Sequence, residues 1–594
     1  MNDVKKKAKT LWQDGLYQDA ISVYYAILKD QPNDVEVLQD LTHLFYDLGS
    51  IEQCFQLARR LETVDAQNIQ AQYYQALCLF QAKKLDLCQK KLRNILKNTP
   101  SHKKSLQLLS QVFFFSKKFD LALRINEQIQ DDDIDTLLQR ALLLLELGFC
   151  SQSNQMLEVC CTKISGDNPT TTKTKTKSLY SNYLHTMLYI DDMSNEMIRT
   201  RHLEYMKIFC TSQNISHHRS EQFWEQKQPK IRIGYISSNL YEHPVASCLL
   251  PIIEHHNREF FEIILFSTEQ PRTDHVTKRF QHIADGFVVV QNQQTTAYRQ
   301  IKDQNIDILI DTIGHTGNHL LSLLQKRLAP IQISMIGYCG PTGILNMDYV
   351  IVDWFTMPEN QNNDCFHEIL LRQKSIFAPY MCTQKYLPKA MRKSESKGIR
   401  FGSTHKIPKI TPQTIQIWSR VLQHFPQSKL CFYRDDFCDL SIQNVVQEFQ
   451  KYGISYNQLE FHNQVTHKRK SHLEIYQEID ILLDTQPWSG HITACESLLM
   501  GVPVLSCTGK NHASRMVASI LYHMNKEEWI AHTPTSLVDC AEIIAKQLIN
   551  SKWTTEQRQK LRKDFLRSPI CNGKLYTEHF EDELKKIIAA KQVP

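Results

Sequence analysis

The sequence predicts an all-helical repeat array followed by two α/β domains, each built on a doubly wound parallel sheet. A repeat of about 34 residues runs through the first 135 residues. After Pro229, short apolar runs alternate with helical stretches, as in a parallel sheet with crossover helices, and a second such series begins at Ile399. At 594 residues, the chain has room for about three or four domains of ordinary size.

In the repeat array, two columns of small residues and three columns of large apolar residues recur at the same spacing. The small columns are Ala20, Cys54, Cys88, Ala122 and Ala8, Thr42, Ala76, Ser110; the large ones are Tyr17, Ile51, Leu85, Phe119, then Leu11, Phe45, Leu79, Phe113, then Ile27, Leu61, Ile95, Ile129. Small residues let paired helices approach, and large residues fill the seam. The pattern resembles the tetratricopeptide repeat, whereas an ordinary helical bundle would keep no fixed period. Such arrays present a concave surface to extended peptides, which predicts a protein partner.

The domain organisation follows from composition and pattern. The sequence predicts a repeat array over 1–164, closed by a terminal helical pair that is out of register. A polar, threonine-rich linker over 165–177 leads to a helical segment over 178–228. The first α/β domain is expected over 229–390 and the second over 391–594.

Composition narrows the class of protein. An apolar content of 42% and a charged content of 22% indicate globular domains, and a net charge of +6 is too small to argue for nucleic acid. No signal segment is evident, and no apolar stretch approaches the ~20 residues that span a bilayer. The seventeen cysteines include no C-x-x-C pair and no zinc-site spacing. We therefore expect buried thiols, no metal, no membrane contact, and a cytoplasmic or nucleocytoplasmic location.

The most informative segment is the stretch from Asp484 to Glu496. It follows an apolar run, 479–483, that predicts a buried strand, and it opens into a predicted helix over 493–500 that Gly501 and Pro503 end. A glycine-bearing loop between a strand and a helix N-terminus directs free N–H groups and a positive dipole end at an anion. Because Glu496 suits the two hydroxyls of a ribose, the segment predicts a nucleotide site.

Further strands fill out both halves. They are expected at 231–237, 261–268, 286–290, 306–311, 331–338 and 349–352, and then at 399–404, 429–433, 459–465, 479–483 and 502–506. Neither half has a dinucleotide or P-loop glycine motif. Two facing Rossmann-like sheets place a ligand in the cleft between their carboxyl edges.

Several blocks together resemble one family, over about residues 178–590. They are Ile233-Gly-Tyr-Ile-Ser-Ser-Asn239 with His243-Pro-Val245, Asp311-Thr-Ile-Gly-His-Thr-Gly317, Arg327-Leu-Ala-Pro-Ile-Gln332, Gly337-Tyr-Cys-Gly-Pro-Thr-Gly343, Met347-Asp-Tyr349, Lys409-Ile-Thr-Pro412, Asp480-Ile-Leu-Leu-Asp-Thr485, Gly490-His-Ile-Thr493, Gly501-Val-Pro503 and Ser514-Arg515. This half is similar to the O-linked N-acetylglucosamine (O-GlcNAc) transferase family, in its SPINDLY-like bacterial and plant branch. That family also carries tetratricopeptide repeats upstream.

The resemblance implies an inverting, metal-independent glycosyltransferase of GT-B fold, with no cofactor. It implies UDP-N-acetylglucosamine (UDP-GlcNAc) as donor and Ser or Thr hydroxyls of proteins, held by the repeat array, as acceptors. The alternatives are a related transferase of another nucleotide sugar, such as fucose or glucose, and a repeat scaffold whose transferase half is inactive.

The resemblance also assigns roles to residues. Lys409 matches the lysine at the leaving diphosphate, and His243 matches the histidine near the sugar and the acceptor hydroxyl, where its pKa range suits proton transfer. The residues expected to bind the UDP-sugar are Lys406, His472, Gly490, His491, Thr493, Glu496, Gly337, Tyr338 and His315.

Other readings of single residues stay open. A lysine such as Lys409 is usually a solvated charge, His243 could cap a loop, and His315 could bond only to backbone at a strand end. The basic run 468–470 reads more readily as a solvated face. This chain also departs from the animal enzyme at His405, Lys406, Pro408 and Ile492, which leaves the choice of sugar open.

Overall fold

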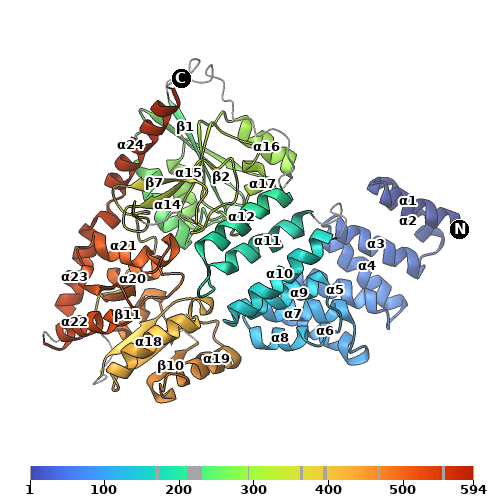
Figure 1. The fold of residues 1–594 in the computed structure, drawn as a ribbon. Helices are drawn as coiled ribbons and strands as arrows, with labels where there is room; N and C mark the ends of the chain where they lie inside the picture. Colours follow the sequence, from blue (N-terminus) through green and yellow to red (C-terminus); the bar gives the residue numbers. More distant parts are fainter. Residues whose placement is uncertain are drawn as a thin grey trace. The chain divides into compact units, whose positions relative to one another are not determined.

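The computed structural model describes residues 2–166, 173–209, 230–291, 293–360, 365–391, 398–463, 469–550 and 555–592. The chain forms two compact units, residues 1–144 and 145–594, drawn in Figure 1. Among the described residues, no helix is both long and apolar enough to cross a bilayer.

The first unit is the predicted array of helical hairpins. Its helices are α1 (Asn2–Gln13), α2 (Tyr17–Asp30), α3 (Val35–Asp47), α4 (Ile51–Val64), α5 (Ile69–Gln81), α6 (Leu85–Asn98), α7 (Lys103–Phe115) and α8 (Phe119–Asn126). The second helix of each pair begins at residue 17, 51, 85 or 119, which confirms the 34-residue period. Ala8, Ala20 and Ala76 are fully buried, so the small columns do lie where helices meet.

The turn inside each hairpin shares one backbone feature. Gly15, Gly49, Lys83 and Lys117 all have positive φ, at 79°, 73°, 58° and 56°, and they lie 34 residues apart. Glycine adopts this conformation without steric cost, and the first two turns use it. The later two turns place lysine there, so the repeat geometry continues after its glycine signature has gone.

The helices that follow, called here the helical lead-in, connect the array to the α/β domains. They are α9 (Ile134–Glu146), α10 (Cys150–Gly166), α11 (Lys173–Met187) and α12 (Asn195–Phe209). The division between the two units falls inside α9, earlier than the array boundary of 164 drawn from the sequence. The predicted linker 165–177 is helical at both ends, while 167–172 and 210–229 lie outside the described residues.

The first α/β domain has a seven-stranded sheet in the order β3-β2-β1-β4-β5-β6-β7, with parallel pairings throughout. Its strands are β1 (Ile231–Ser237), β2 (Phe261–Ser267), β3 (Gly286–Val289), β4 (Ile308–Asp311), β5 (Ile331–Ser334), β6 (Tyr349–Asp353) and β7 (Ile369–Gln373); its helices are α14 (Pro244–His255), α15 (His275–Ile283), α16 (Gln294–Lys302) and α17 (Leu321–Leu324). The strand predicted to reach 338 ends at Ser334, because Ile336 takes a φ of 67°. The edge strand β7 was not predicted.

The second α/β domain has a six-stranded parallel sheet in the order β10-β9-β8-β11-β12-β13. Its strands are β8 (Arg400–Ser403), β9 (Lys429–Tyr433), β10 (Leu459–His462), β11 (Ile481–Leu483), β12 (Val504–Cys507) and β13 (Ile530–Ala531); its helices are α18 (Pro412–His424), α19 (Asp439–Gln450), α20 (Ile492–Leu499), α21 (Met516–His523), α22 (Ser536–Asn550) and α23 (Thr555–Arg567). The two parallel sheets confirm the predicted pair of Rossmann-like domains.

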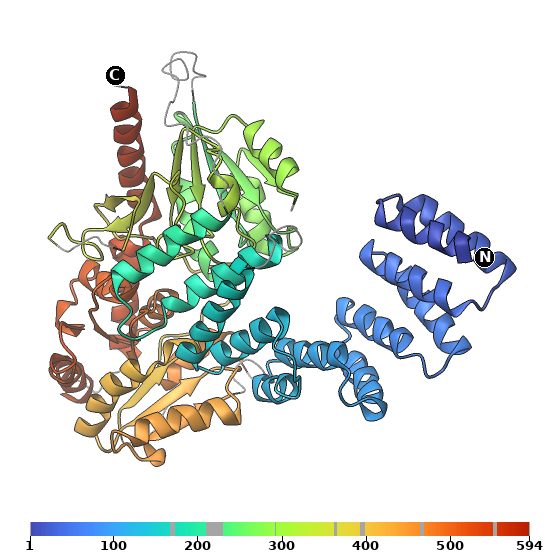
Figure 2. The same cartoon turned by 45° about the vertical axis from the view of Figure 1, so that its right-hand side comes forward.

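The last helix, α24 (Gly573–Gln592), returns to the first α/β domain. It packs on α14 and β7, and Figure 2 shows it, in dark red, running along the green domain. Glu581 of this helix accepts hydrogen bonds from the His256 ring (2.9 Å) and from the Asn257 N–H (2.8 Å). The C-terminus therefore ties the two sheet domains together.

Candidate functional site

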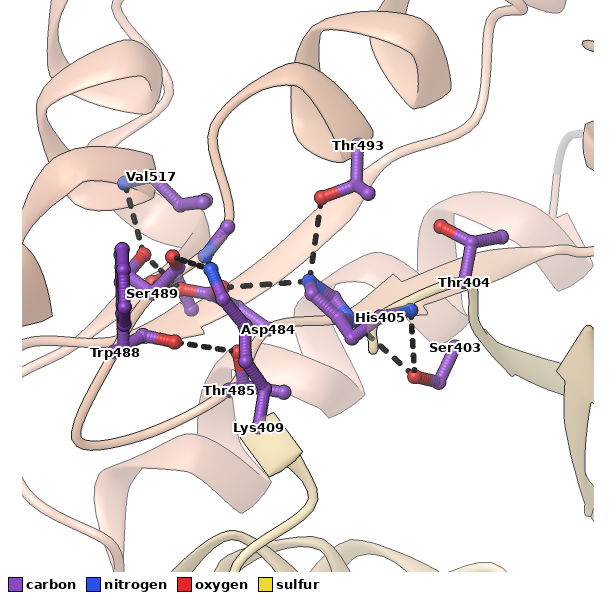
Figure 3. Close-up of polar contacts among 12 residues, drawn as sticks. Ser403, Thr404, His405, Lys409, Asp484, Thr485, Trp488, Ser489, Thr493 and Val517 are labelled. Atoms are coloured by element: carbon purple, nitrogen blue, oxygen red, sulfur yellow. Dashed lines mark hydrogen bonds and ion pairs between the residues drawn. The ribbon is translucent and has the colours of Figure 1, made fainter. Parts of the chain in front are cut away.

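The loop between β11 and α20 is held rigidly by one buried carboxylate. Asp484 accepts hydrogen bonds from the Gly490 N–H (2.7 Å) and from the hydroxyls of Ser489 (2.7 Å) and Ser506 (2.6 Å). Ser489 Oγ in turn accepts the Val517 N–H at 3.1 Å. Figure 3 shows the Asp484 carboxylate between Ser489 and the His405 ring. The loop is therefore preorganised by the protein alone.

Lys409 extends into this loop from a short 3-10 helix, Ile407–Lys409. Its Nζ donates to the carbonyl of Ser489 at 2.7 Å and lies 4.8 Å from the centroid of the Trp488 ring. Burial disfavours the ammonium form and lowers the pKa of Lys409 to about 8. A cation held in low dielectric next to a helix N-terminus is well suited to receive an anionic group.

The N-terminus of α20 supplies backbone donors at the same place. Its first helical hydrogen bond runs from the Cys495 N–H to the His491 carbonyl, so the N–H groups of residues 492–494 precede it. Gly490 is required by space, because a Cβ there would lie 2.7 Å from Thr493 Oγ1 and 2.9 Å from His405 Nε2. The structure thus brings together Lys409, Gly490, His491 and Thr493, as predicted from the sequence.

The site formed by Lys409, Gly490 and the N-terminus of α20 is called here the anion pocket. Two histidines line it, both in neutral form. His405 Nε2 lies 3.3 Å from Thr493 Oγ1, and its Nδ1 lies 3.2 Å from Ser403 Oγ. The His491 ring packs on Phe377, with centroids 4.8 Å apart, and its Nε2 is buried with no hydrogen-bond partner among the described residues. Burial, reinforced by Lys409, lowers the pKa of both rings to about 3. A buried polar atom without a partner is rare, and a ligand group would satisfy it.

The predicted ribose site is a linked trio on the side of α20. Glu496 Oε1 lies 2.7 Å from His472 Nε2, and Glu496 Oε2 accepts the Tyr476 hydroxyl at 3.1 Å. Burial alone would lower the pKa of His472, but the hydrogen bond and charge of Glu496 raise it overall. Tyr476 was not singled out from the sequence, since nothing in the local pattern distinguishes it from a core tyrosine. Lys406 is exposed, and its charge acts on Lys409 and His243.

His243 is the N-cap of α14 in the first α/β domain. Its Nδ1 accepts the Val245 N–H at 3.2 Å, so the neutral ring carries its proton on Nε2. Burial, together with repulsion from Lys406 and Arg272, lowers the pKa of His243 to about 4. The capping role leaves Nε2–H available as a hydrogen-bond donor, but it occupies the lone pair that the predicted proton transfer would need.

A cavity of about 400 Å³ is lined from both α/β domains, and Glu242, the residue before His243, is part of its lining. Its lining residues are Glu242, Thr273, Asp274, His275, Lys278, Gln384, Lys385, Tyr386 and Lys470. Glu242 precedes His243 in the chain, and Lys470 lies two residues before His472. In the basic run 468–470, Lys468 lies outside the described residues and Arg469 pairs with Glu478 at 2.6 Å. The cavity is thus lined by sequence neighbours of His243 and His472 but by neither histidine itself.

His315 and Tyr338 make hydrogen bonds to backbone and to α11 and α12. His315 Nε2 donates to the Thr342 carbonyl (2.8 Å), and its Nδ1 accepts the Ser181 hydroxyl of α11 (3.0 Å). The Tyr338 hydroxyl donates to His202 Nε2 of α12 at 2.7 Å. Both side chains are buried, and these hydrogen bonds fasten α11 and α12 to the first α/β domain. Their predicted contact with the UDP-sugar stays a prediction.

Gly337 shows how closely this joint is packed. A Cβ there would lie 2.0 Å from the Thr312 carbonyl oxygen. The close approach of the two backbone segments therefore leaves room only for glycine at this position. Its predicted contact with the UDP-sugar stays a prediction.

One group of side chains has the composition of a metal site. Cys431, Glu460 and His462 bring one ligand atom each within 4.8 Å of one another on β9 and β10. Arg400 donates to Glu460 at 2.8 Å, and burial raises the pKa of the Cys431 thiol to about 12. The guanidinium supplies a positive charge to Glu460, while His462 Nε2, 3.7 Å from Glu460, makes no hydrogen bond among the described residues.

Comparisons with known proteins agree with this geometry. The profile of glycosyl transferase family 41 matches residues 154–380 and 387–580. The probable UDP-N-acetylglucosamine–peptide N-acetylglucosaminyltransferase SPINDLY of Hordeum vulgare is 29% identical over 421 residues, which cover 68% of this chain and 43% of that protein. The SPINDLY protein of Arabidopsis thaliana, with the same description, is 28% identical over 374 residues, covering 61% and 40%. The chain thus spans less than half the length of these curated relatives.

A solved structure is similar over most of the chain. A mutant O-GlcNAc transferase of Thermobaculum terrenum superposes with a TM-score of 0.75 at 21% identity, over 88% of this chain and 97% of that one. This likeness shows a shared fold of helical repeats and two Rossmann-like domains. Because the family profile covers both α/β domains and the helices that precede them, the chain belongs to glycosyl transferase family 41.

Proposed function

We propose that the protein transfers N-acetylglucosamine from UDP-GlcNAc to serine or threonine hydroxyls of proteins, with inversion at the sugar carbon and without a metal ion. The observation that carries the proposal is Lys409, held at 2.7 Å from the Ser489 carbonyl beside the N-terminus of α20. The family of the chain and the descriptions of its SPINDLY relatives support the choice of donor.

The anion pocket suits the leaving group. When the acceptor oxygen bonds to the sugar carbon, the bond from that carbon to the diphosphate breaks and UDP leaves with added negative charge. Lys409 and the N–H groups at the start of α20 would hold that charge in place without reorganisation. Glu496 and His472 would receive the ribose, which fixes the nucleotide in one orientation.

His243 would act as a hydrogen-bond donor. Because its Nδ1 already accepts the Val245 N–H, the neutral ring has no free lone pair with which to take a proton from the acceptor. Its Nε2–H would orient the sugar or the acceptor hydroxyl. The lowered pKa keeps the ring neutral throughout the physiological range.

The acceptor would approach through the cavity that Glu242 lines, and the helical array would hold the rest of the acceptor protein. The repeat geometry of the array supports a role in acceptor binding, since the concave surfaces of helical repeat arrays bind extended peptides. We place the reaction in the cytoplasm, or in the cytoplasm and nucleus. The free cysteines of the described residues support a reducing compartment.

The experiment is transfer of labelled N-acetylglucosamine from UDP-GlcNAc into the proteins of a cell extract. Wild-type protein should label acceptors and Lys409→Ala should not. Lys574→Ala is the matched control, because that side chain is exposed and, in the described part of the chain, its only ion pair is with Glu578 on its own helix. Equal labelling by wild type and Lys409→Ala would refute the role of the lysine. If neither protein transfers label but the wild type binds UDP, the donor is another nucleotide sugar. If the wild type does not bind UDP, the protein is better explained as a scaffold.

A further inference from the structure

The segment that carries Lys409, residues 405–414, is called here the lysine loop. It contains one turn of 3-10 helix and the start of α18. A three-residue 3-10 turn has little stability of its own. An error of about 1 Å in the placement of a catalytic group can cost about 10²-fold in rate. The lysine loop therefore needs support from outside itself.

The turn between α9 and α10 contacts the lysine loop immediately before Lys409. Gly148 has a φ of 89°, and a Cβ on it would lie 3.0 Å from Ile407 Cγ2. The Cys150 thiol donates to the Pro408 carbonyl at 3.3 Å, and this thiol is buried. The two residues that precede Lys409 are thus in direct contact with the helices that follow the repeat array.

The segment after α11 holds the other end of the loop. Asp191 Oδ2 accepts the Gln413 N–H at 2.8 Å, which is one of the unpaired N–H groups in the first turn of α18. Thr411 caps the same helix by accepting the Thr414 N–H at 3.2 Å. Without the carboxylate of Asp191, the Gln413 donor would lose its partner and the start of α18 would be free to shift.

A third contact reaches the neighbour of the lysine side chain. The Trp488 ring, which lies 4.8 Å from Lys409 Nζ, also lies 4.8 Å from the Tyr189 ring and 5.3 Å from the His185 ring of α11. The ammonium group is therefore bordered by an aromatic side chain that the lead-in helices hold. Residues 148–191 thus contact Ile407, Pro408, Gln413 and Trp488, the residues that surround Lys409.

We propose that Gly148, Cys150 and Asp191 are positioning residues, which fix the lysine loop so that Lys409 lies at the diphosphate of the donor. This rests on the proposed function of Lys409 as the group that binds the leaving diphosphate. It gives the helical lead-in a part in catalysis, in addition to connecting the array to the α/β domains.

The placement of Lys409 can be measured through its titration. The titratable groups that affect it or that it affects are Lys406, His405, Asp484, Cys339, His185 and His491. Burial is the largest cause of its lowered pKa of about 8. A lysine loop that moves out of this position exposes the ammonium group, so the pKa of Lys409 should rise towards the ordinary value of about 10.4.

The first test uses Asp191→Ala and Asp191→Asn in the full chain. Acetic anhydride modifies only the neutral amine, so the rate of Lys409 acetylation against pH, followed by peptide mass spectrometry, reports its pKa without any donor. Asp191→Ala should raise this pKa by at least one unit and lower kcat/KM for the donor by about 10-fold or more. Asp191→Asn keeps an oxygen acceptor for the Gln413 N–H and should restore most of both. An unchanged pKa of Lys409 in Asp191→Ala would overturn the proposal.

The second test uses Gly148→Ala, whose methyl group would press on Ile407. Gly453→Ala is its matched control, because Gly453 has a similar φ of 73° in the same unit and no heavy atom within 4 Å of its Cβ position. Both variants carry the same backbone strain, and both should lose similar thermal stability. Only Gly148→Ala should raise the pKa of Lys409 and lower kcat/KM. Equal effects of the two variants on Lys409 would show that the contact is merely structural.

The two readouts separate this inference from the proposed function. If the wild-type protein transfers no sugar, the proposed function fails, while the acetylation measurement still decides whether residues 148–191 position Lys409. If transfer occurs and the pKa of Lys409 is insensitive to both variants, the proposed function stands and this inference falls.

Discussion

Raising the pH should reduce sugar transfer at a lower pH than an ordinary lysine would allow. The pKa of Lys409 is lowered to about 8 by burial, and in the proposed function only its ammonium form would hold the diphosphate. About nine tenths of the side chain is charged at pH 7 and about one tenth at pH 9, so kcat/KM should fall about 10-fold over that interval. A solvated lysine, with a pKa of about 10.4, would stay almost fully charged.

The assay is transfer from UDP-GlcNAc to a serine-containing peptide at donor concentrations below KM, since kcat/KM reports the free enzyme. Lys409→Ala should lower kcat/KM at pH 7 by about 10²–10³-fold, the size of one preorganised electrostatic group, and its profile should lack the alkaline limb. Circular dichroism at each pH controls for unfolding. A wild-type profile that is flat to pH 9.5, or an alkaline limb that persists in Lys409→Ala, would refute the assignment of the limb to this residue.

The remaining predictions concern the sugar, the ribose and the array. Asn at an N-cap can accept the Val245 N–H as His243 does. His243→Asn should therefore keep the melting temperature of the wild type and lower kcat/KM about 10-fold. An unchanged kcat/KM would show that His243 is not part of the site. Glu496→Gln should weaken UDP binding, measured by calorimetry, about 10-fold. It should also lower the pKa of His472, since Glu496 raises that pKa. NMR titration of the His472 ring measures this change, and an unchanged pKa would contradict the pairing. Deletion of residues 1–133, up to the start of α9, should spare transfer to short peptides and reduce transfer to whole proteins; equal loss on both would show that the array does not hold the acceptor.

Much of the fold could be predicted from local patterns. The 34-residue spacing of Tyr17, Ile51, Leu85 and Phe119 matched the starts of four helices, because each of these residues begins the second helix of a hairpin. Buried parallel strands such as β9 matched their apolar runs residue for residue. The strand that stops at Ser334 was overestimated, because apolar residues continue past the point where Ile336 reverses the backbone.

The loop and helix of the anion pocket were predictable because they lie close in sequence, whereas Lys409 is 80 residues from Ser489 and was assigned from the family resemblance. A strand, a glycine loop and a helix between Asp484 and Glu496 form a local motif, and Lys409 stands at the start of a helix. The contacts of His315 and Tyr338 could not be predicted, because their partners Ser181 and His202 lie more than a hundred residues away.

The same limit applies to the support of Lys409. Nothing near Gly148 or Asp191 in the sequence indicates that these residues meet the lysine loop. Only the assembled second unit brings them together.

The central claim is that the protein uses UDP-GlcNAc as its donor, and intact-mass spectrometry of an acceptor protein tests it most directly. The wild-type protein is incubated with that acceptor and an equimolar mixture of UDP-GlcNAc, UDP-glucose and GDP-fucose. We expect the acceptor to gain the mass of N-acetylhexosamine only, and to gain nothing when Lys409→Ala replaces the wild type. A gain of hexose or deoxyhexose mass in place of N-acetylhexosamine, or an equal gain with Lys409→Ala, would contradict the account.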